Sequence, residues 1–235
     1  MSKRLLISGG SGRFAGEIIK YNTEYKIYAP TRNEMDITNV NSINNAITKF
    51  KPDIFLHPAA LTRPMVKHVN CPDISIRTNI IGTSNVCLGC MKTNTKVVYI
   101  STDYVYPGTN GNYKETDPLL PVNLYAWSKL GGECAVRLYH NSLILRVCMT
   151  ERPFVHPKAL VDARKNLMYI EDAAKICLRL LDQSGIINVG GDPTNSYDFV
   201  KLENPDIKKI YRKDISDVDM AKDSTMDLTK LKGIQ

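Results

Sequence analysis

The chain has 235 residues, of which 43% are hydrophobic and 23% are charged, as expected for a globular protein with one substantial core. No apolar run approaches the roughly 18 residues of a membrane span, and no targeting segment is evident, so we expect a cytoplasmic protein without a membrane partner. The net charge of +7 comes from dispersed lysines and arginines. This dispersion argues against a nucleic-acid partner and favours small phosphate-bearing ligands.

The six cysteines are scattered along a chain that is too long to need disulfide bonds for its stability. Cys87 and Cys90 form a single Cys-x-x-Cys pair, with no second pair and no histidine nearby. We therefore expect buried thiols in a reducing compartment and no metal site.

A strand, a glycine-rich turn and a helix open the chain. Residues 3–8 are predicted to form a short buried strand, and residues 15–21 have the apolar spacing of a helix. Between them, Gly9 permits a tight turn, and Gly12 lets backbone N–H groups approach a pyrophosphate at the helix N-terminus. Ala15 takes the third position of the Gly-x-x-Gly-x-x-Gly pattern, where a methyl group is tolerable. The context predicts a dinucleotide site rather than a plain turn between strand and helix.

The segment after the second predicted strand, residues 26–30, indicates which cofactor is bound. In NAD-binding folds an acidic residue about 20 positions beyond the glycines holds the ribose 2′-hydroxyl. Arg32 stands at that distance, and no acidic residue occurs between Lys26 and Asn33. An arginine suits a 2′-phosphate, so NADP(H) is favoured over NADH, with a solvated loop arginine as the alternative.

Helices and strands continue to alternate to about residue 147. We predict helices over 40–50, 74–93 and 123–139, and strands over 54–56, 96–100 and 142–147. The alternation implies an α/β fold with a doubly wound parallel sheet, the Rossmann fold. We expect His57, which follows the strand over 54–56, to be a packed histidine rather than a catalyst.

The sequence divides into a nucleotide-binding domain over 1–150 and a small C-terminal substrate-binding region over 151–235. The second part contains a predicted helix over 173–182 and a strand over 186–189, and it becomes more polar from about residue 195. We interpret it as a cap on the carboxyl edge of the sheet, with a partly ordered tail over 223–235.

A hydroxyl cluster and a Tyr-x-x-x-Lys pattern are the candidates for catalysis. Ser101 and Thr102 follow the strand over 96–100, at the edge of the sheet where ligands bind. Tyr125 and Lys129 are four residues apart and would share one face of a helix. A nearby ammonium favours phenolate and so helps a tyrosine to pass a proton. Taken alone, the pattern also fits an exposed helical turn.

In this order and spacing, the motifs resemble the extended short-chain dehydrogenase/reductases, most closely their dTDP-4-dehydrorhamnose reductase-like branch. The matching stretches are residues 9–17, 31–38, 57–60, 79–82, 101–107, 125–133, 145–146 and 188–191. The resemblance implies that Tyr125 donates the proton and that Thr102 hydrogen-bonds the substrate carbonyl. Lys129 would bind the nicotinamide ribose and lower the pKa of Tyr125.

The resemblance also implies the residues that bind each ligand. Cofactor contacts are expected at Gly9, Ser11, Gly12, Arg13, Phe14, Arg32, Asp36, Ile37, Pro58, Ala59, Ala60, Asn79, Ser101, Tyr125 and Lys129. Contacts with the sugar nucleotide are expected at Thr62, Arg63, Thr102, Asp103 and Tyr104. Asn79 is either satisfied within the protein or orders the lysine through water.

Two departures from the family pattern affect the expected chemistry. His57 stands where asparagine is common, and Tyr104 stands where bifunctional epimerase-reductases have an acid/base cysteine. We therefore expect reduction without epimerisation. The C-terminal region is short for the branch, so we expect a substrate pocket that is either open or partly built by a second subunit. The resemblance suggests a homodimer through the helices near 76–92 and 123–140, and a buried core face is an equally good account of the same residues.

The resemblance implies an NADPH-dependent reductase of a nucleoside-diphosphate 4-keto-6-deoxysugar, acting in deoxysugar nucleotide biosynthesis. Two alternatives stay open. One is an epimerase or dehydratase on the same fold that holds NAD tightly. The other is a non-catalytic regulatory subunit that binds NADP.

Overall fold

A parallel sheet of six strands lies at the centre of the protein, which a computed structural model describes over residues 2–234. The strand order is β10-β5-β4-β3-β1-β2, and all neighbouring strands are parallel. The strands are β1 (Arg4–Ile7), β2 (Lys26–Tyr28), β3 (Ile54–His57), β4 (Lys96–Thr102), β5 (Ser142–Val147) and β10 (Gly185–Val189). The order reverses between β1 and β3, and ligands bind at such a point in doubly wound sheets. The topology confirms the predicted Rossmann-type fold.

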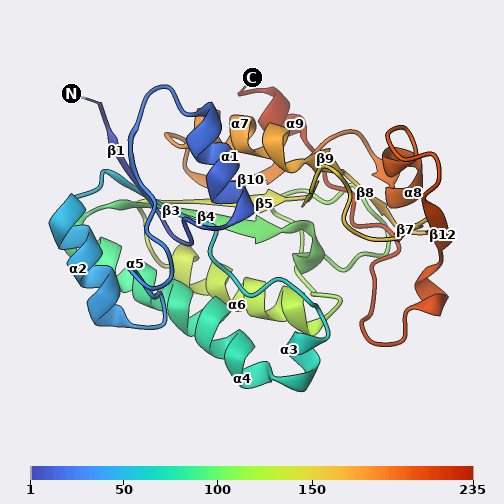
Figure 1. The fold of residues 1–235 in the computed structure, drawn as a ribbon, viewed down its shortest axis with the longest axis horizontal. Helices are drawn as coiled ribbons and strands as arrows, with labels where there is room; N and C mark the ends of the chain where they lie inside the picture. The colour runs from blue at the N-terminus through green and yellow to red at the C-terminus, as the bar shows by residue number, and fades with distance from the viewer. Residues whose placement is uncertain (1, 235) are drawn as a thin grey trace.

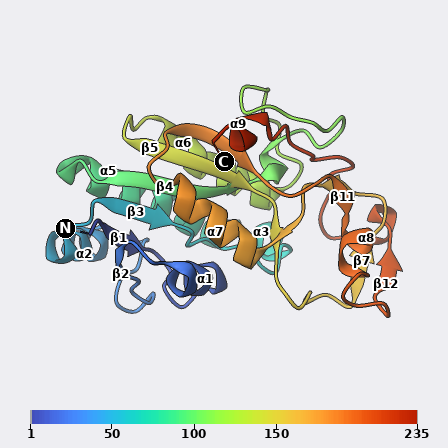
Figure 2. The ribbon, with the colours of Figure 1, turned by 90° about the horizontal axis from the view of Figure 1, so that it is seen from above.

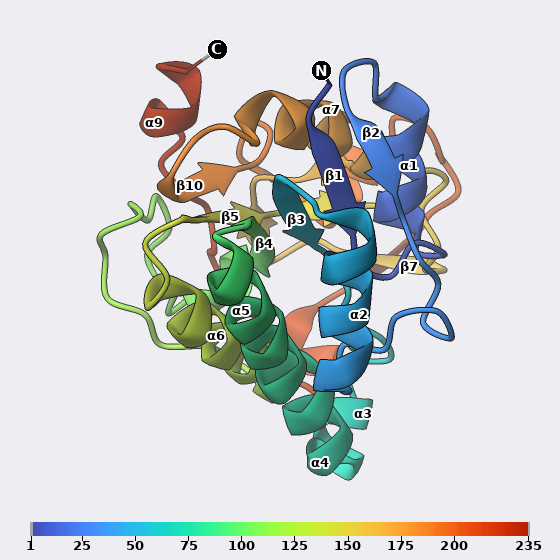
Figure 3. The same ribbon diagram turned by 90° about the vertical axis from the view of Figure 1, so that its left-hand side faces the viewer.

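Helices cover both faces of the sheet, which gives the three layers seen in Figure 3. One face is covered by α1 (Arg13–Tyr21), α7 (Ile170–Leu180) and α9 (Thr229–Lys232), and the other by α2 (Val40–Phe50), α5 (Gly82–Thr93) and α6 (Leu124–Arg137) (Figure 1). Along β4, Val98 and Ile100 enter the first of these cores, whereas Val97 and Tyr99 enter the second. This strand is a continuous apolar run because both of its faces are buried. None of the helices within residues 2–234 is long and apolar enough to cross a membrane.

The predicted helix over 74–93 is interrupted by a π-helical turn. The chain passes from α3 (Lys67–Asn70) through α4 (Pro72–Ser75) and the π-helical turn η1 (Ile76–Ile81) into α5. The apolar residues of this stretch fit an ordinary helix, so the sequence pattern did not predict the π-helical turn. Such turns often occur at functional sites because they redirect a side chain within a helix.

The small elements after residue 148 lie beyond the carboxyl end of the main sheet (Figure 2). They are β6 (Met149–Thr150), β7 (Lys158–Leu160), β8 (Arg164–Lys165), β9 (Met168–Tyr169), β11 (Thr194–Asn195), α8 (Ser196–Val200), β12 (Lys208–Ile210) and the 3₁₀ turn η3 (Arg212–Asp214). These strands pair as three two-stranded sheets. The region over 151–235 is not a cap alone, since α7 and β10 return to the layers of the main domain.

The C-terminal segment is packed, so the prediction of a partly ordered tail is wrong over residues 223–234; residue 235 lies outside the described range. Ser224 is 0% exposed and Met226 is 2% exposed. The Ser224 hydroxyl donates to Asp103 Oδ2 at 2.6 Å, and the Met226 amide donates to Asn166 Oδ1 at 2.6 Å. Polar groups in this segment are buried because they have partners in the main domain and in the cap.

A buried ion pair joins α6 to β5. Arg146 Nη2 lies 2.9 Å from Glu133 Oε2, and the two side chains are 1% and 0% exposed. Arg146 also donates to Tyr106 Oη at 2.8 Å, and Tyr106 donates in turn to Asn188 Oδ1 at 2.8 Å. The network fixes the helix that carries Tyr125 relative to the sheet.

The two cysteines of the Cys-x-x-Cys pair are free and buried on α5. Burial raises the pKa of Cys87 to about 12 and raises that of Cys90 as well. Both therefore remain protonated thiols at neutral pH, as expected for packed rather than reactive cysteines. No cluster of potential metal ligands occurs within residues 2–234.

Candidate active site

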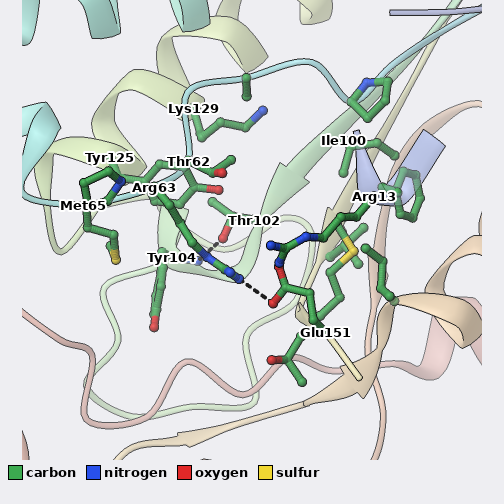
Figure 4. Close-up of a pocket in the computed structure, with 18 of the residues that line it drawn as sticks. Arg13, Thr62, Arg63, Met65, Ile100, Thr102, Tyr104, Tyr125, Lys129 and Glu151 are labelled. Carbon is green, nitrogen blue, oxygen red and sulfur yellow. Dashed lines mark hydrogen bonds and ion pairs between the residues drawn. The ribbon is translucent and has the colours of Figure 1, made fainter. Parts of the chain in front are cut away.

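A cavity of about 1310 Å³ lies between the carboxyl ends of the central strands and the cap (Figure 4). The predicted site residues that line it are Gly9, Ser11, Gly12, Arg13, Phe14, Arg32, Asp36, Ile37, Pro58, Ala59, Ala60, Thr62, Arg63, Ser101, Thr102, Asp103, Tyr104, Tyr125 and Lys129. Asn79 is the exception among the predicted residues. The fold therefore brings together residues from five separate sequence motifs.

The glycine turn places the N-terminus of α1 at the cavity. Gly9 has a φ of +66°, and Gly12 precedes the helix without a side-chain cap. The first turn of α1 carries no acidic residue. The backbone N–H groups of this turn and the positive end of the helix dipole therefore remain available to an anion. Ala15 is 1% exposed in the core beside β1, which confirms that a methyl group fits the third position of the pattern.

Gly10, which the sequence pattern did not single out, has the strictest steric requirement in this turn. Its amide donates to the Pro30 carbonyl at 2.8 Å. A Cβ at this position would lie 1.9 Å from the Ala29 carbonyl oxygen, so a side chain cannot be accommodated. The turn thus needs Gly10 to pass close to the chain that leaves β2.

Thr102, Tyr125 and Lys129 surround one part of the cavity, from the end of β4 and the first turns of α6 (Figure 4). The helix begins after Asn123, whose side chain accepts a hydrogen bond from the Ala126 amide at 3.0 Å. This cap fixes the first turn of α6, in which Tyr125 lies. The predicted pairing of the hydroxyl cluster with Tyr-x-x-x-Lys is therefore present in the fold.

Burial dominates the acid–base properties of this group. Burial raises the pKa of Tyr125, the Asp103 charge raises it further, and a hydrogen bond with Thr102 acts in the opposite direction. Burial lowers the pKa of Lys129 to about 7, despite the opposing charge of Glu133. Tyr125 is therefore a protonated phenol at neutral pH, whereas Lys129 changes its charge near neutrality.

Glycines allow α6 to approach the sheet and the π-helical turn closely. A Cβ on Gly132 would lie 2.5 Å from Tyr99 Oη, and one on Gly131 would lie 2.8 Å from Ile80 Cδ1. Tyr99 Oη donates to the Lys129 carbonyl at 3.1 Å, and the Lys129 ammonium lies 4.1 Å from the centre of the Tyr99 ring. Backbone packing thus sets the depth at which Lys129 enters the site.

Asn79, on η1, holds the neighbouring loop instead of lining the cavity. Its Oδ1 accepts from the Leu61 amide at 2.7 Å, and its Nδ2 donates to the Leu61 carbonyl at 2.9 Å. Nδ2 also donates to Ser128 Oγ at 2.8 Å, and the residue is 1% exposed. The amide is engaged within the protein and joins the loop before Thr62 to α6. Its expected contact with the cofactor stays a prediction.

His57 is packed, as the sequence predicted. Its Nδ1 lies 2.7 Å from Ser8 Oγ, and its Nε2 lies 3.1 Å from Thr83 Oγ1. Burial, with a further contribution from the charge of Lys129, lowers the pKa of His57 to about 3. The ring is therefore neutral across the physiological pH range and links β1, β3 and α5.

Two arginines of the cavity share one carboxylate, that of Glu151 (Figure 4). Arg13 Nη1 lies 2.7 Å from Glu151 Oε1, and Arg63 Nη2 lies 2.6 Å from Oε2. Burial alone would raise the pKa of Glu151, but the hydrogen bond and charge of Arg63, with a smaller effect of Arg13, lower it overall. Glu151 was not predicted, because no local pattern marks a residue whose partners lie 138 and 88 positions away.

Arg32 lies at the outer end of the cavity beside a predicted neighbour. Its side chain is 77% exposed, and its Nε lies 3.6 Å from Asp36 Oδ2. Asp36 Oδ1 accepts from the Thr38 amide at 2.9 Å and from its hydroxyl at 2.8 Å. Burial opposes these hydrogen bonds, yet together with the Arg32 charge they lower the pKa of Asp36. This end of the cavity therefore offers an exposed cation beside a hydrogen-bonded carboxylate.

Lys165, from β8 of the cap, is a second residue that the sequence did not predict. Its ammonium donates to Tyr104 Oη at 2.5 Å and lies 4.1 Å from the centre of that ring. Burial would lower the pKa of Lys165, but Tyr104, Asp103 and Cys148 outweigh it and raise the pKa. A charged lysine thus lies in the wall next to the hydroxyl cluster, with no motif around it in the sequence.

The strand order and the glycine turn after β1 define a Rossmann-type protein, with the Tyr125–Lys129 pair at its cavity. Residues 3–150 match the family described as RmlD substrate binding domain, and the chain belongs to this family. The predicted resemblance is confirmed by this match.

Two curated relatives illustrate the similarity. A dTDP-4-dehydrorhamnose reductase from Aggregatibacter actinomycetemcomitans is 32% identical over 152 residues, which cover 63% of this chain and 51% of that protein. Methionine adenosyltransferase 2 subunit beta from Xenopus tropicalis is 25% identical over 239 residues, which cover 89% of this chain and 66% of that protein. The chain thus spans about half the length of the first of these relatives.

Solved structures agree with the fold over nearly the whole chain. A dTDP-4-dehydrorhamnose reductase from Bacillus anthracis in complex with NADP gives a TM-score of 0.87 at 23% identity, covering 99% of this chain and 91% of that one. A hypothetical dTDP-4-dehydrorhamnose reductase from Sulfolobus tokodaii gives a TM-score of 0.87 at 22% identity, covering 99% and 94%. At these identities the likeness establishes the fold.

Proposed function

We propose that the protein is an NADPH-dependent reductase of a nucleoside-diphosphate 4-keto-6-deoxysugar. The observation that carries this proposal is the presence of Thr102, Tyr125 and Lys129 in one cavity with the glycine turn. Family membership and the reductase relatives support the same substrate class. The reaction belongs to deoxysugar nucleotide biosynthesis, as the sequence resemblance implies.

The nucleotide-binding edge fits a dinucleotide. The N-terminus of α1 has free N–H groups for a diphosphate, and Pro58, Ala59 and Ala60 give a flat wall beside it. Arg32 would pair with a 2′-phosphate, which favours NADP(H) over NADH, and Asp36 with Ile37 would contact the adenine end. Ser101 would lie against the nicotinamide end, since its buried hydroxyl has no partner among the described residues.

When bound, NADPH would supply the hydride for reduction of the sugar ketone. Tyr125 would donate its phenolic proton to the oxygen of that ketone. Burial raises the pKa of Tyr125 and so weakens it as an acid, and a charged Lys129 would have to offset this effect. The Thr102 hydroxyl donates to Asp103 Oδ1 at 3.1 Å, so it would have to turn from that carboxylate to donate to the ketone oxygen and orient it. Lys129 would bind the nicotinamide ribose. In its charged form, Lys129 would also stabilise the phenolate that forms when Tyr125 gives up its proton. Asn79 would act at a distance by holding the loop and α6 together.

The substrate would extend from this point towards the two arginines. Arg63 would bind a phosphate of the nucleotide sugar, while Thr62, Asp103 and Tyr104 would face the sugar. Tyr104 Oη already accepts a hydrogen bond from Lys165, which agrees with a binding role rather than an acid/base role. We therefore retain reduction without epimerisation.

The experiment is NADPH oxidation with a panel of nucleoside-diphosphate 4-keto-6-deoxysugars. Tyr125→Phe should reduce turnover by about 10²- to 10⁴-fold, the usual contribution of a positioned general acid. NADPH affinity should change less than about twofold, since the phenol oxygen is a minor part of the binding surface. Tyr21→Phe, on α1 outside the cavity, is the matched control. Retention of half the wild-type rate in Tyr125→Phe contradicts the proposal.

A second candidate is a non-catalytic subunit that binds NADP(H). It is favoured by the similarity to methionine adenosyltransferase 2 subunit beta over 89% of the chain. The complete Thr102, Tyr125 and Lys129 set argues for the reductase instead. Tight NADPH binding with no oxidation of NADPH across the panel would select the subunit.

We also propose a homodimer through α5 and α6. Leu88 and Met91 on α5 are 54% and 39% exposed, and Trp127 on α6 is 48% exposed. Light scattering should give twice the monomer mass for the wild type and the monomer mass for Leu88→Glu. The control is Leu202→Glu in the cap, where the leucine is 80% exposed, and it should leave the mass unchanged.

A further inference from the structure

Lys165 is a buried cation whose hydrogen-bonding capacity is only partly used. The residue is 7% exposed, lines the cavity and gives one N–H to Tyr104. An ammonium has three N–H donors. Within residues 2–234 no other hydrogen bond of this ammonium is found. Two donors are therefore free for a ligand in the cavity.

The neighbouring carboxylate does not satisfy these donors. Asp103 Oδ1 accepts from the Thr102 hydroxyl at 3.1 Å, and Oδ2 accepts from the Ser224 hydroxyl at 2.6 Å. None of the ion pairs within 4.0 Å among residues 2–234 includes Lys165. The Asp103 charge keeps the lysine protonated from a distance without bonding to it. A buried ammonium in this situation gains from an additional oxygen acceptor.

The position of Lys165 suggests which part of a ligand it meets. Tyr104 and Asp103 directly follow Thr102, and the charges of both act on Tyr125. Lys165 and its partner Tyr104 therefore line the same cavity as Thr102 and Tyr125, and Tyr104 closely follows the hydroxyl cluster in the chain. The arginines that suit phosphates, Arg13 and Arg63, instead meet at Glu151.

We propose that Lys165 is a specificity-determining residue of the substrate site, where its free donors bind a ring or hydroxyl oxygen of the sugar. Lys165 and Tyr104 together would then bind a sugar that has an oxygen atom within reach of the Lys165 ammonium. They would discriminate against a sugar that has a hydrogen atom or a methyl group at that position. Sites built around hydrogen-bond donors reject such analogues strongly, because the buried donors are left unpaired. This inference rests on the proposed nucleotide-sugar function and adds the recognition of the sugar itself.

The test measures binding, not turnover. With NADP⁺ at saturation, calorimetry gives Kd for dTDP and Kd for dTDP-glucose. The ratio of Kd for dTDP to Kd for dTDP-glucose reports the contribution of the sugar to binding. In Lys165→Met this ratio should fall by about 10- to 100-fold, the magnitude of a hydrogen bond to a charged donor. Kd for dTDP and for NADP⁺ should stay within about twofold of the wild type. Lys165→Arg should recover part of the ratio because it keeps the charge.

Two controls separate recognition from structure. Lys158→Met removes an exposed lysine that also lines the cavity, and it should leave the ratio unchanged. Among dTDP-sugars that lack a single hydroxyl, one should bind to the wild type more weakly than dTDP-glucose does. The same compound should have the same Kd as dTDP-glucose in Lys165→Met. A purely structural role of Lys165 would weaken dTDP and dTDP-glucose equally, and that result overturns the proposal.

The outcomes also distinguish the two levels of inference. The wild type is titrated with the same pair of ligands carrying thymidine, uridine or guanosine, and binding of none of them would refute the substrate class and the role of Lys165 together. Wild-type protein that prefers dTDP-glucose, with the same ratio in Lys165→Met, would refute the role of Lys165 alone. A loss of dTDP affinity without a change in the ratio would assign the lysine to the phosphates and overturn sugar recognition.

Discussion

Replacing Glu151 by glutamine should tighten the binding of diphosphate ligands. The carboxylate accepts from Arg13 at 2.7 Å and from Arg63 at 2.6 Å, so a phosphate at either arginine competes with it. The glutamate side chain is 16% exposed, whereas the two arginines are 64% and 42% exposed, and solvent therefore screens both pairs. Glutamine keeps one neutral acceptor and removes the negative charge.

The magnitude follows from the exposure of the arginines. Exposed ion pairs contribute about 0–1 kcal/mol each. Breaking both pairs on ligand binding therefore reduces the binding free energy by at most about 2 kcal/mol. Glu151→Gln should thus lower Kd for NADP⁺ and dTDP by about 3- to 30-fold, at roughly 1.4 kcal/mol for each factor of ten. The gain should shrink between low and high salt because screening weakens the competing pairs in the wild type.

Calorimetric titration of NADP⁺ and dTDP at two salt concentrations measures the effect. Glu17→Gln is the matched control, since Glu17 lies on the same helix as Arg13 but pairs with Lys20. Weaker binding by Glu151→Gln would refute the reasoning. It would mean that Glu151 orients the arginines for the ligand rather than competing with it.

Further predictions concern stability and the position of α6. Burial lowers the pKa of Lys129 in the folded state to about 7, below its ordinary value of 10.5. Between these two pH values the unfolded state therefore binds more protons than the folded state, and the folded state gains stability as pH rises through this window. The unfolding free energy of wild type minus Lys129→Met should therefore increase by up to about 1.4 kcal/mol per pH unit in urea titrations across that window. Arg146→Met should lower the unfolding free energy by about 3–5 kcal/mol in the same assay, because it leaves the Glu133 carboxylate buried and unpaired. The double variant Arg146→Met/Glu133→Leu should recover most of that stability, and a double variant no more stable than Arg146→Met would contradict the pairing. Gly132→Ala should reduce both turnover and thermal stability, whereas Gly16→Ala, with nothing within 4 Å of the new methyl, should raise stability by up to about 1 kcal/mol in thermal denaturation.

Local sequence patterns predicted the parts of the site that local geometry determines. The spacing of Tyr125 and Lys129 places both on one face of α6, and the glycines beside Ser11 form the turn before α1. The buried strands could be predicted for the same reason, since a run of apolar residues is what a strand buried on both faces requires. The parallel arrangement of the sheet follows from the alternation of these strands and helices.

The missed residues depend on contacts between distant segments. Lys165 meets Tyr104 across 61 positions, and nothing near Lys165 in the sequence marks it as a cavity residue. Ser224 is buried in a polar stretch only because Asp103 accepts its hydroxyl, so composition wrongly predicted a loosely ordered tail. The π-helical turn at Asn79 changes the hydrogen bonding of a helix while its apolar spacing persists, and periodicity does not detect it.

The contact between Ser224 and Asp103 has a consequence for the biosynthesis of the protein. Asp103 lies next to Thr102, and its partner is made 121 residues later. The central strands can assemble while the chain is still being synthesised, since domains fold from the N-terminal side as they emerge. The wall of the site stays incomplete until the segment around Ser224 and Met226 has left the ribosome. A nascent chain would therefore be able to fold around its glycine turn before it could recognise a sugar.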